Sequence, residues 1–460
     1  MEIRTTQIKD FTKGNITQQL TAFAWPLFLS NLLQVVYNMA DMVIVGKVLG
    51  RTGLSAVAVG GDVSHLLTFV SMGFASAGQV IIARYIGAGQ REKIAGFVGT
   101  MSSFLMGCAL TLSCLGLLLQ DQLLTWMHTP AEAWQGAWSY SAVTMTGLVF
   151  VYGYNVVSAI LRGMGDSRHP FIFISIAAVL NLLLDLLFVA GFHWGAGGAA
   201  LATVISQAVS FISCVIFLGR NREQFDLNIR KQDFIHWNKE MLGELIWLGI
   251  PMSIKSASIQ ISKLFVNSWI NSYGVAVSAF AGIANKIANI SILISNSMNT
   301  AGATMVGQNL AAGEYQRVKK ILLVIAQITL SIAAIMSVVL WRFPEEIFGL
   351  FTEPGEQEVL SLAAGYVPIA ALLFFGSASR AIMNALINGS GNHRINFATA
   401  ILDGIILRIG LALFFGLVLD MKHYGFWLGD ALAGFTPFWI GLVFYLTGGW
   451  KKQAQMQKRG

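Results

Sequence analysis

The chain alternates long apolar stretches with short polar loops, a pattern that predicts membrane-spanning helices. A helix needs about 20 mainly apolar residues to cross about 30 Å of hydrocarbon. Twelve stretches reach this length. They cover residues 17–46, 54–80, 94–118, 134–160, 171–191, 195–218, 242–272, 277–306, 318–341, 359–387, 397–419 and 425–447. We therefore expect an all-α integral membrane protein with twelve transmembrane helices.

The second half of the chain repeats the first in a weakly similar form. Three matches define the register: residues 24–26 with 249–251, 85–91 with 309–315, and 159–166 with 385–392. Because each copy holds six spans, both copies enter the membrane from the same side, and a pseudo-twofold axis would relate two six-helix lobes. The predicted divisions are an N-lobe (1–218), a cytoplasmic linker (219–241) and a C-lobe (242–460).

Composition agrees with a membrane protein and gives its orientation. Only 12% of the residues are charged and the mean hydropathy is +0.64, whereas about a quarter of a soluble chain is charged. The net charge of +7 follows from topology, so nucleic acid is not an expected partner. Of the 30 Lys and Arg residues, 21 lie on the side that holds both termini and only four on the other. Cytoplasmic loops are the basic ones. We therefore expect the protein to lie in the cytoplasmic (inner) membrane with both termini in the cytoplasm.

Acidic side chains inside the first-half spans are candidate functional residues. A charge near the bilayer centre costs at least about 2.5–3.5 kcal/mol on insertion scales. Asp41 shares a helix face with Gln34 and Asn38, and Asp185 shares one with Asn181. A stripe of small and polar residues on the sixth span comprises Ala199, Thr203, Ser206 and Gln207. Such oxygens could coordinate a small cation, and buried carboxylates could take a proton. The alternative is that the acids only bond neighbouring helices.

The second-half spans carry mostly cations. They are Lys255, Lys263, Lys286, Arg380 and Arg408, accompanied by Gln260 and Asn384. These cations could contact anionic substrate groups, or they could pair with Asp403 and Asp430 or extend to the interface. Asp403 and Arg408 are five residues apart, about 140° around an α-helix, so we do not expect them to pair with each other.

Two prolines occupy matching positions in the repeat. Pro26 lies inside the first span and Pro251 inside the seventh. A proline removes one helical hydrogen bond and creates a bend point. A static kink and a moving hinge are both consistent with this position.

Taken together, these residues resemble the multidrug and toxic compound extrusion (MATE) family over nearly the whole chain. The resemblance rests on the twelve spans, on Pro26 followed by Asp41, on residues 161–166 after the fourth span, and on Asn181 with Asp185. It implies the DinF-type branch, with H⁺ or possible Na⁺ bound at Asp41, Asn181, Asp185 and Thr203, beside Ala199. The NorM-type branch is implied to use acids in spans 7 and 10 as well, and this chain has cations there.

The resemblance implies a secondary antiporter that exports amphipathic, often cationic drug-like compounds in exchange for H⁺ or Na⁺. We expect no enzyme activity, no cofactor beyond the coupling ion, contact with membrane lipids and a monomeric state. The expected substrate-cavity residues are Gln34, Tyr37, Asn38, Asn155, Ser206, Gln207, Lys255, Gln260, Lys263, Lys286, Arg380 and Asn384.

Three other functions are compatible with parts of the sequence. A flippase or exporter of a lipid-linked or anionic amphiphile would use the second-half cations. A channel would conduct without coupling. An intramembrane aspartyl protease would use the Gly163-Met164-Gly165-Asp166 motif, but the repeat carries Asn392 in place of the acid. That substitution indicates a backbone requirement of the turn. A Walker A motif for ATP hydrolysis is lacking.

Overall fold

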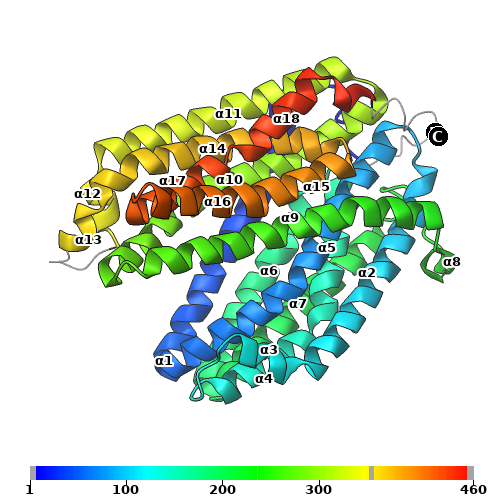
Figure 1. The fold of residues 1–460 in the computed structure, drawn as a ribbon. Coiled ribbons are helices and arrows are strands. Elements are labelled where there is room, and N and C mark those ends of the chain that lie inside the picture. Colours follow the sequence, from blue (N-terminus) through cyan, green and yellow to red (C-terminus); the bar gives the residue numbers. More distant parts are fainter. Residues whose placement is uncertain (1–6, 236, 352–356, 453–460) are drawn as a thin grey trace. The chain divides into compact units, whose positions relative to one another are not determined.

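The computed structural model describes residues 7–235, 237–351 and 357–452, and within them the chain forms helices and no β-strand (Figure 1). The helices of the first half are α1 (Ile16–Gly87), α2 (Glu92–Leu118), α3 (Gln120–Trp126), α4 (Trp134–Thr146), α5 (Leu148–Gly163), α6 (Arg168–Asp185), the π-helix η1 (Leu186–Gly191), α7 (Gly195–Arg220) and α8 (Lys231–Ile235). Those of the second half are α9 (Lys239–Asn271), α10 (Val275–Ala312), α11 (Tyr315–Arg342), α12 (Pro344–Gly349), α13 (Gln357–Ser361), α14 (Ala363–Gly389), α15 (His393–Ile401), the π-helix η2 (Leu402–Ile406), α16 (Leu407–Leu413), the π-helix η3 (Phe414–Val418), α17 (Lys422–Ala433) and α18 (Thr436–Leu446).

The helices account for all twelve predicted spans. Within the described residues, nine helical stretches are long and apolar enough to cross a membrane, and α4 with α5 forms a further span bent by 47°. Two predicted spans are merged in α1, which has 72 residues. The more polar α9, with 33 residues, supplies the remaining one. The predicted fold class is therefore confirmed.

The first two predicted spans are separated by a single residue with non-helical backbone. Gly50 has φ 66° and ψ −159°, while the flanking residues remain helical. This combination is accessible essentially only to glycine, because it has no Cβ. We had expected a loop between residues 46 and 54, and the structure replaces it with this one-residue break.

The chain divides into two compact units. Among the described residues, the first unit contains 7–10 and those of 25–253, and the second contains 11–24 and those of 254–452. The starting segments of α1 and α9 thus pack in the unit opposite to the rest of their helix, with Pro26 and Pro251 next to the two crossover points. The predicted N-lobe, linker and C-lobe follow chain order and stay a prediction.

Each unit has a helix that packs against several others. In the first unit, α7 contacts α4, α5 and α6. In the second, α14 contacts α10, α11, α17 and α18. Most residues of α14 are buried, as expected of a helix that is surrounded by other helices. Polar side chains within these cores are therefore removed from solvent.

Candidate functional site

Two carboxylic acids lie close together in the core of the first unit. Asp41 is in the first segment of α1, and Asp185 is the last residue of α6, directly before the π-helix η1. The two side chains interact with each other. Asp185 is fully buried, and neither of its oxygens accepts a hydrogen bond from the residues that the structure describes. Such a pair of acceptors without protein donors is suited to a proton or a small cation.

Neutral oxygens lie one helical turn before Asp185 on α6 and on the neighbouring helix α7. The Asn181 amide, one helical turn before Asp185 on α6, donates to the Thr203 hydroxyl of α7 at 3.4 Å. Thr203 in turn donates to the Ala199 carbonyl oxygen at 3.1 Å. Carboxylate, amide, hydroxyl and carbonyl oxygens together form a donor set that hard cations prefer. The sequence placed these residues on single helix faces, and the structure places them on three helices of one unit.

Tyr140 of α4 belongs to the same group, although sequence analysis did not identify it. Its side chain interacts with Thr203 and experiences the charges of Asp41 and Asp185, and Tyr37 also interacts with it. The ring packs against α1 at Gly60, where an added Cβ would lie 2.8 Å from the ring atom Cδ1 of Tyr140. Gly60 could have indicated this contact in the sequence, because a glycine permits close approach of an aromatic ring to the helix backbone.

The remaining predicted residues of the first half do not all join this group. Asn155 donates to the Ser71 hydroxyl at 3.0 Å, and Ser206 donates to the Ala202 carbonyl oxygen of its own helix. Gln207 has a buried Oε1 atom without a hydrogen bond among the described residues. Gln34 is partly buried and Asn38 is exposed. Their role as cavity residues stays a prediction.

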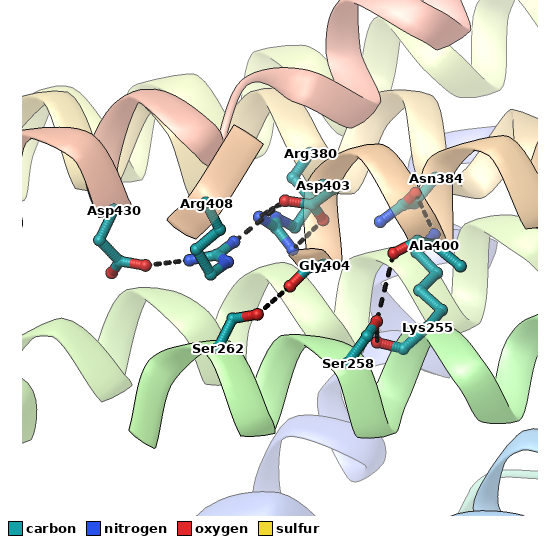
Figure 2. Close-up of polar contacts among 10 residues, drawn as sticks. All are labelled: Lys255, Ser258, Ser262, Arg380, Asn384, Ala400, Asp403, Gly404, Arg408 and Asp430. Carbon is teal, nitrogen blue, oxygen red and sulfur yellow. Dashed lines mark hydrogen bonds and ion pairs between the residues drawn. The ribbon is translucent and has the colours of Figure 1, made fainter. Parts of the chain in front are cut away.

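The second unit holds a buried network of ion pairs in place of an acidic pair (Figure 2). Arg380 of α14 pairs with Asp403 of η2 at 2.9 Å. Arg408 of α16 pairs with Asp403 at 3.0 Å and also with Asp430 of α17. Two guanidinium groups therefore balance two carboxylates. This pairing is the structural alternative that the sequence left open for Arg380.

The contact between Asp403 and Arg408 corrects our expectation that residues five apart would not pair. Asp403 lies in η2, and Arg408 follows directly in α16. A π-helix forms hydrogen bonds between residues i and i+5, so it brings residues five apart onto the same face. The α-helical angle that we assumed does not apply in this segment.

The other second-half candidates have separate surroundings. The Lys255 ammonium group donates to the Asn384 amide oxygen at 2.6 Å (Figure 2). Gln260 is exposed. Lys286 is exposed and lies 5.8 Å from the centre of the Phe351 ring. Lys263 lines a cavity together with Asp430. The structure therefore does not gather all of these side chains in one place.

The turn that resembles a protease motif is a helix-capping turn. Asp166 Oδ1 accepts hydrogen bonds from the backbone N–H groups of Arg168 and His169. In the repeat, Asn392 Oδ1 accepts one from the N–H group of Ile395. Capping needs only a side-chain oxygen, which explains why Asp and Asn both occur.

Comparison with known proteins identifies relatives along most of the chain. A sequence model of the MatE family matches residues 26–187 and 251–414. "Probable multidrug resistance protein YoeA" of Bacillus subtilis is 27% identical over 450 residues, which cover 96% of each chain. "Multidrug export protein MepA" of Staphylococcus aureus is 25% identical over 87% of this chain and 88% of its own.

Solved structures share the fold. One described as "Crystal structure of MATE in the bent conformation" matches with a TM-score of 0.87 and 22% sequence identity. The match covers 99% of this chain and all of the solved one. At this identity the similarity shows the arrangement of helices, and the helices agree over the whole length of both chains.

Proposed function

This chain belongs to the MatE family, and from that premise we propose that it is a secondary antiporter that exports amphipathic, often cationic organic compounds in exchange for H⁺ or Na⁺. It is a membrane transporter of a family whose curated relatives are named multidrug resistance and export proteins, so the expectation that it is not an enzyme is confirmed. The proposal places it in the cytoplasmic membrane with both termini inside. Residues 1–6 and 453–460, on which part of that orientation depends, lie outside the described residues.

The observation that carries the proposal is the acidic pair of Asp41 and Asp185. Both acids interact with Tyr140, which belongs to a core of apolar residues from α1, α3, α4, η1 and α7. Two negative charges in such surroundings repel each other and are poorly solvated, so binding of one H⁺ or Na⁺ relieves a large electrostatic cost. Asn181 and Thr203 would supply the neutral oxygens of a Na⁺ site.

Ion entry can drive export if the ion and the substrate favour different conformations. Each monovalent ion that moves inward gains about 2.3 kcal/mol per 100 mV of membrane potential. We infer that neutralising the acidic pair changes the packing of the first segment of α1, which carries Asp41.

Pro26 is the point in α1 where such a change would cost least. The proline leaves one carbonyl group of the preceding turn without its helical donor, and the Ser30 hydroxyl donates to the Pro26 carbonyl oxygen at 2.8 Å. In this structure α1 remains helical through Pro26. We propose that α1 bends here.

Dye efflux from membrane vesicles tests the proposal, with a pH gradient and a sodium gradient imposed separately. We expect Asp41→Asn and Asp185→Asn to abolish efflux of a cationic dye such as ethidium under the gradient that drives the wild type. The neutral amide cannot exchange a proton and lacks the charge that holds Na⁺.

The matched control is Asp62→Asn, which changes an exposed acid of the same helix and should leave efflux unchanged. Full efflux by either core variant would exclude the acidic pair as the coupling site. Efflux without any gradient dependence would indicate a channel.

A further inference from the structure

A row of polar side chains leads away from the candidate ion site along α7. Thr203, Gln207, Ser210 and Cys214 are spaced by four, three and four residues, so they share one face of the helix. Thr203 belongs to the candidate ion site, where it contacts Asn181. Cys214 lies about three turns further along α7. The row therefore connects the ion site with the far part of this helix.

A second polar row lies on α5, which packs against α7. Tyr154, Ser158 and Arg162 follow one another at intervals of four residues, so they also share a helix face. Arg162 interacts electrostatically with Tyr154 of its own helix and with Cys214 of α7. The two rows therefore meet at Arg162.

Tyr37 of α1 links the row on α5 to the acidic pair. It lies one helical turn before Asp41 and interacts electrostatically with that carboxylate. It also interacts with Tyr140 of the candidate site and with Tyr154 of α5. Polar groups therefore lead from the acidic pair to Arg162 both by way of α1 and α5 and along α7.

Three oxygens of the two rows have no hydrogen-bond partner among the described residues. They are the hydroxyl oxygens of Ser158 and Ser210, both fully buried, and the amide oxygen of Gln207. Buried polar groups nearly always bond to protein or to ordered water. Oxygens of this kind on neighbouring helices are suited to bind water, which can carry a proton or hydrate a small cation.

Arg162 places a permanent positive charge at the end of this polar route, because a guanidinium group keeps its proton in proteins. It donates to the Gln79 amide oxygen at 2.9 Å. Among the residues that the structure describes, no carboxylate forms an ion pair with it. The titratable groups that interact with it are the Tyr154 hydroxyl and the Cys214 thiol, which are ordinarily neutral at physiological pH. Its charge is therefore not balanced locally.

Arg162 and Asp185 lie toward opposite ends of α6. Arg162 is in the last turn of α5, just before the turn that is capped by Asp166. α6 begins after that turn and ends at Asp185, 18 residues long and so about 27 Å in length. In the proposed orientation the turn is cytoplasmic, and Arg162 stands between the acidic pair and the cytoplasm.

We propose that Arg162 is an electrostatic barrier that keeps the coupling ion from leaking from the acidic pair to the cytoplasm through the first unit. Fixed positive groups exclude cations and protons from pores in this way. The ion then reaches the cytoplasm only with the conformational change that accompanies export. This proposal rests on the proposed transport function, which supplies the ion that the barrier holds back.

Ion entry into proteoliposomes without any export substrate tests the proposal. An internal pH dye follows H⁺ and radioactive sodium follows Na⁺, each under its own inward gradient. We expect Arg162→Gln to raise the entry of at least one of the two ions about tenfold over the wild type, the factor that corresponds to about 1.4 kcal/mol of repulsion between like charges. Arg162→Lys keeps the charge and should stay at the wild-type rate. An Arg162→Gln protein as tight as the wild type for both ions would overturn the proposal.

Two comparisons locate the leak. Arg220→Gln removes an exposed cation at the end of α7 and should leave ion entry unchanged. Adding Asp41→Asn and Asp185→Asn to Arg162→Gln should abolish the extra ion entry, because the route then lacks the carboxylates that load the ion. Extra entry that persists in this combined variant would contradict a route that starts at the acidic pair.

A charge-cancelling variant decides the matter if Arg162→Gln does not fold. Cys214→Asp would place a carboxylate next to the guanidinium group and cancel its charge, so ion entry should rise by a similar factor. Cys214→Asn is nearly isosteric with that variant but neutral, and it should match the wild type. Equal ion entry in the two variants would contradict the barrier. Because no substrate is present, a protein that leaks as expected but exports no dye would refute only the transport proposal.

Discussion

The Tyr140 side chain interacts with Thr203 and electrostatically with both acids of the first unit, and we predict that it tunes their affinity for the coupling ion. Tyr140→Phe should weaken coupling-ion binding by about tenfold, since a hydrogen bond to a charged or ion-binding group contributes about 1.5–3 kcal/mol. The measurement is the ion concentration that gives half-maximal dye efflux in vesicles.

Tyr152→Phe is the matched control for this prediction. Tyr152 is a buried tyrosine of the same unit whose hydroxyl donates to the Leu67 carbonyl oxygen at 2.6 Å. Its replacement should lower the free energy of unfolding and leave the half-maximal ion concentration unchanged. Equal shifts in both variants would show that Tyr140 acts only through stability.

Individual residues were predictable where helical periodicity alone decides their neighbours. Asp41, Asn181, Asp185 and Thr203 were selected from charge in apolar spans and from helix faces, and the structure groups them in one unit. Tyr140 was missed because an isolated tyrosine in an apolar span is ordinary. Its significance comes from the helix it faces, and a single sequence does not state which helices are neighbours.

At the scale of elements, the break in α1 depends on the conformation of one glycine. A Cβ at Gly50 would meet no atom within 4 Å, so any cost of Gly50→Ala comes from the backbone. We predict that this variant lowers the free energy of unfolding by about 1–3 kcal/mol, because its dihedral angles are essentially restricted to glycine. Thermal unfolding in detergent measures the effect.

Gly107→Ala is the control for the glycine prediction. Gly107 also has open space around its Cα atom, but it lies inside α2 and has no positive φ. Alanine should be neutral or stabilising there, since it favours the helix more than glycine does. If both variants unfold at the wild-type temperature, the break at Gly50 does not require glycine.

Elements were predictable from hydropathy, but their internal irregularities were not. The twelve apolar stretches correspond to helices or pairs of helices. Hydropathy carries no information on the bend between α4 and α5 or on the π-helices η1, η2 and η3. This is why the pairing of Asp403 with Arg408 was wrongly excluded, although both residues were correctly identified as buried charges.

At the scale of the whole molecule, the segment before α1 is held to the second unit by side chains far along the chain. Arg317 donates to the carbonyl oxygens of Phe11, Lys13 and Gly14. The Asn309 amide also donates to the Phe11 carbonyl oxygen, at 3.1 Å. Residues 11–24 belong to the same unit as Asn309 and Arg317.

Arg317→Ala should release this segment. We expect trypsin to cleave after Lys13, which is exposed, about tenfold faster than in the wild type, because the loss of about 1.4 kcal/mol of hydrogen bonding raises the open population by that factor. Mass spectrometry of timed digests measures the rate. Lys320→Ala changes an exposed residue of the same helix and should digest at the wild-type rate; equal rates for Arg317→Ala would show that the tie does not hold the segment.

The same tie has a consequence for biosynthesis. The backbone N–H of Phe11 donates to the side chain of Gln308, 297 residues later in the chain. At about 5–20 residues per second, a ribosome needs roughly 15–60 s to cover that distance. During this interval the leading end of the first transmembrane helix is already in or at the bilayer and its binding partner does not exist. The insertion machinery or a lipid interface must shelter that end until translation reaches α10.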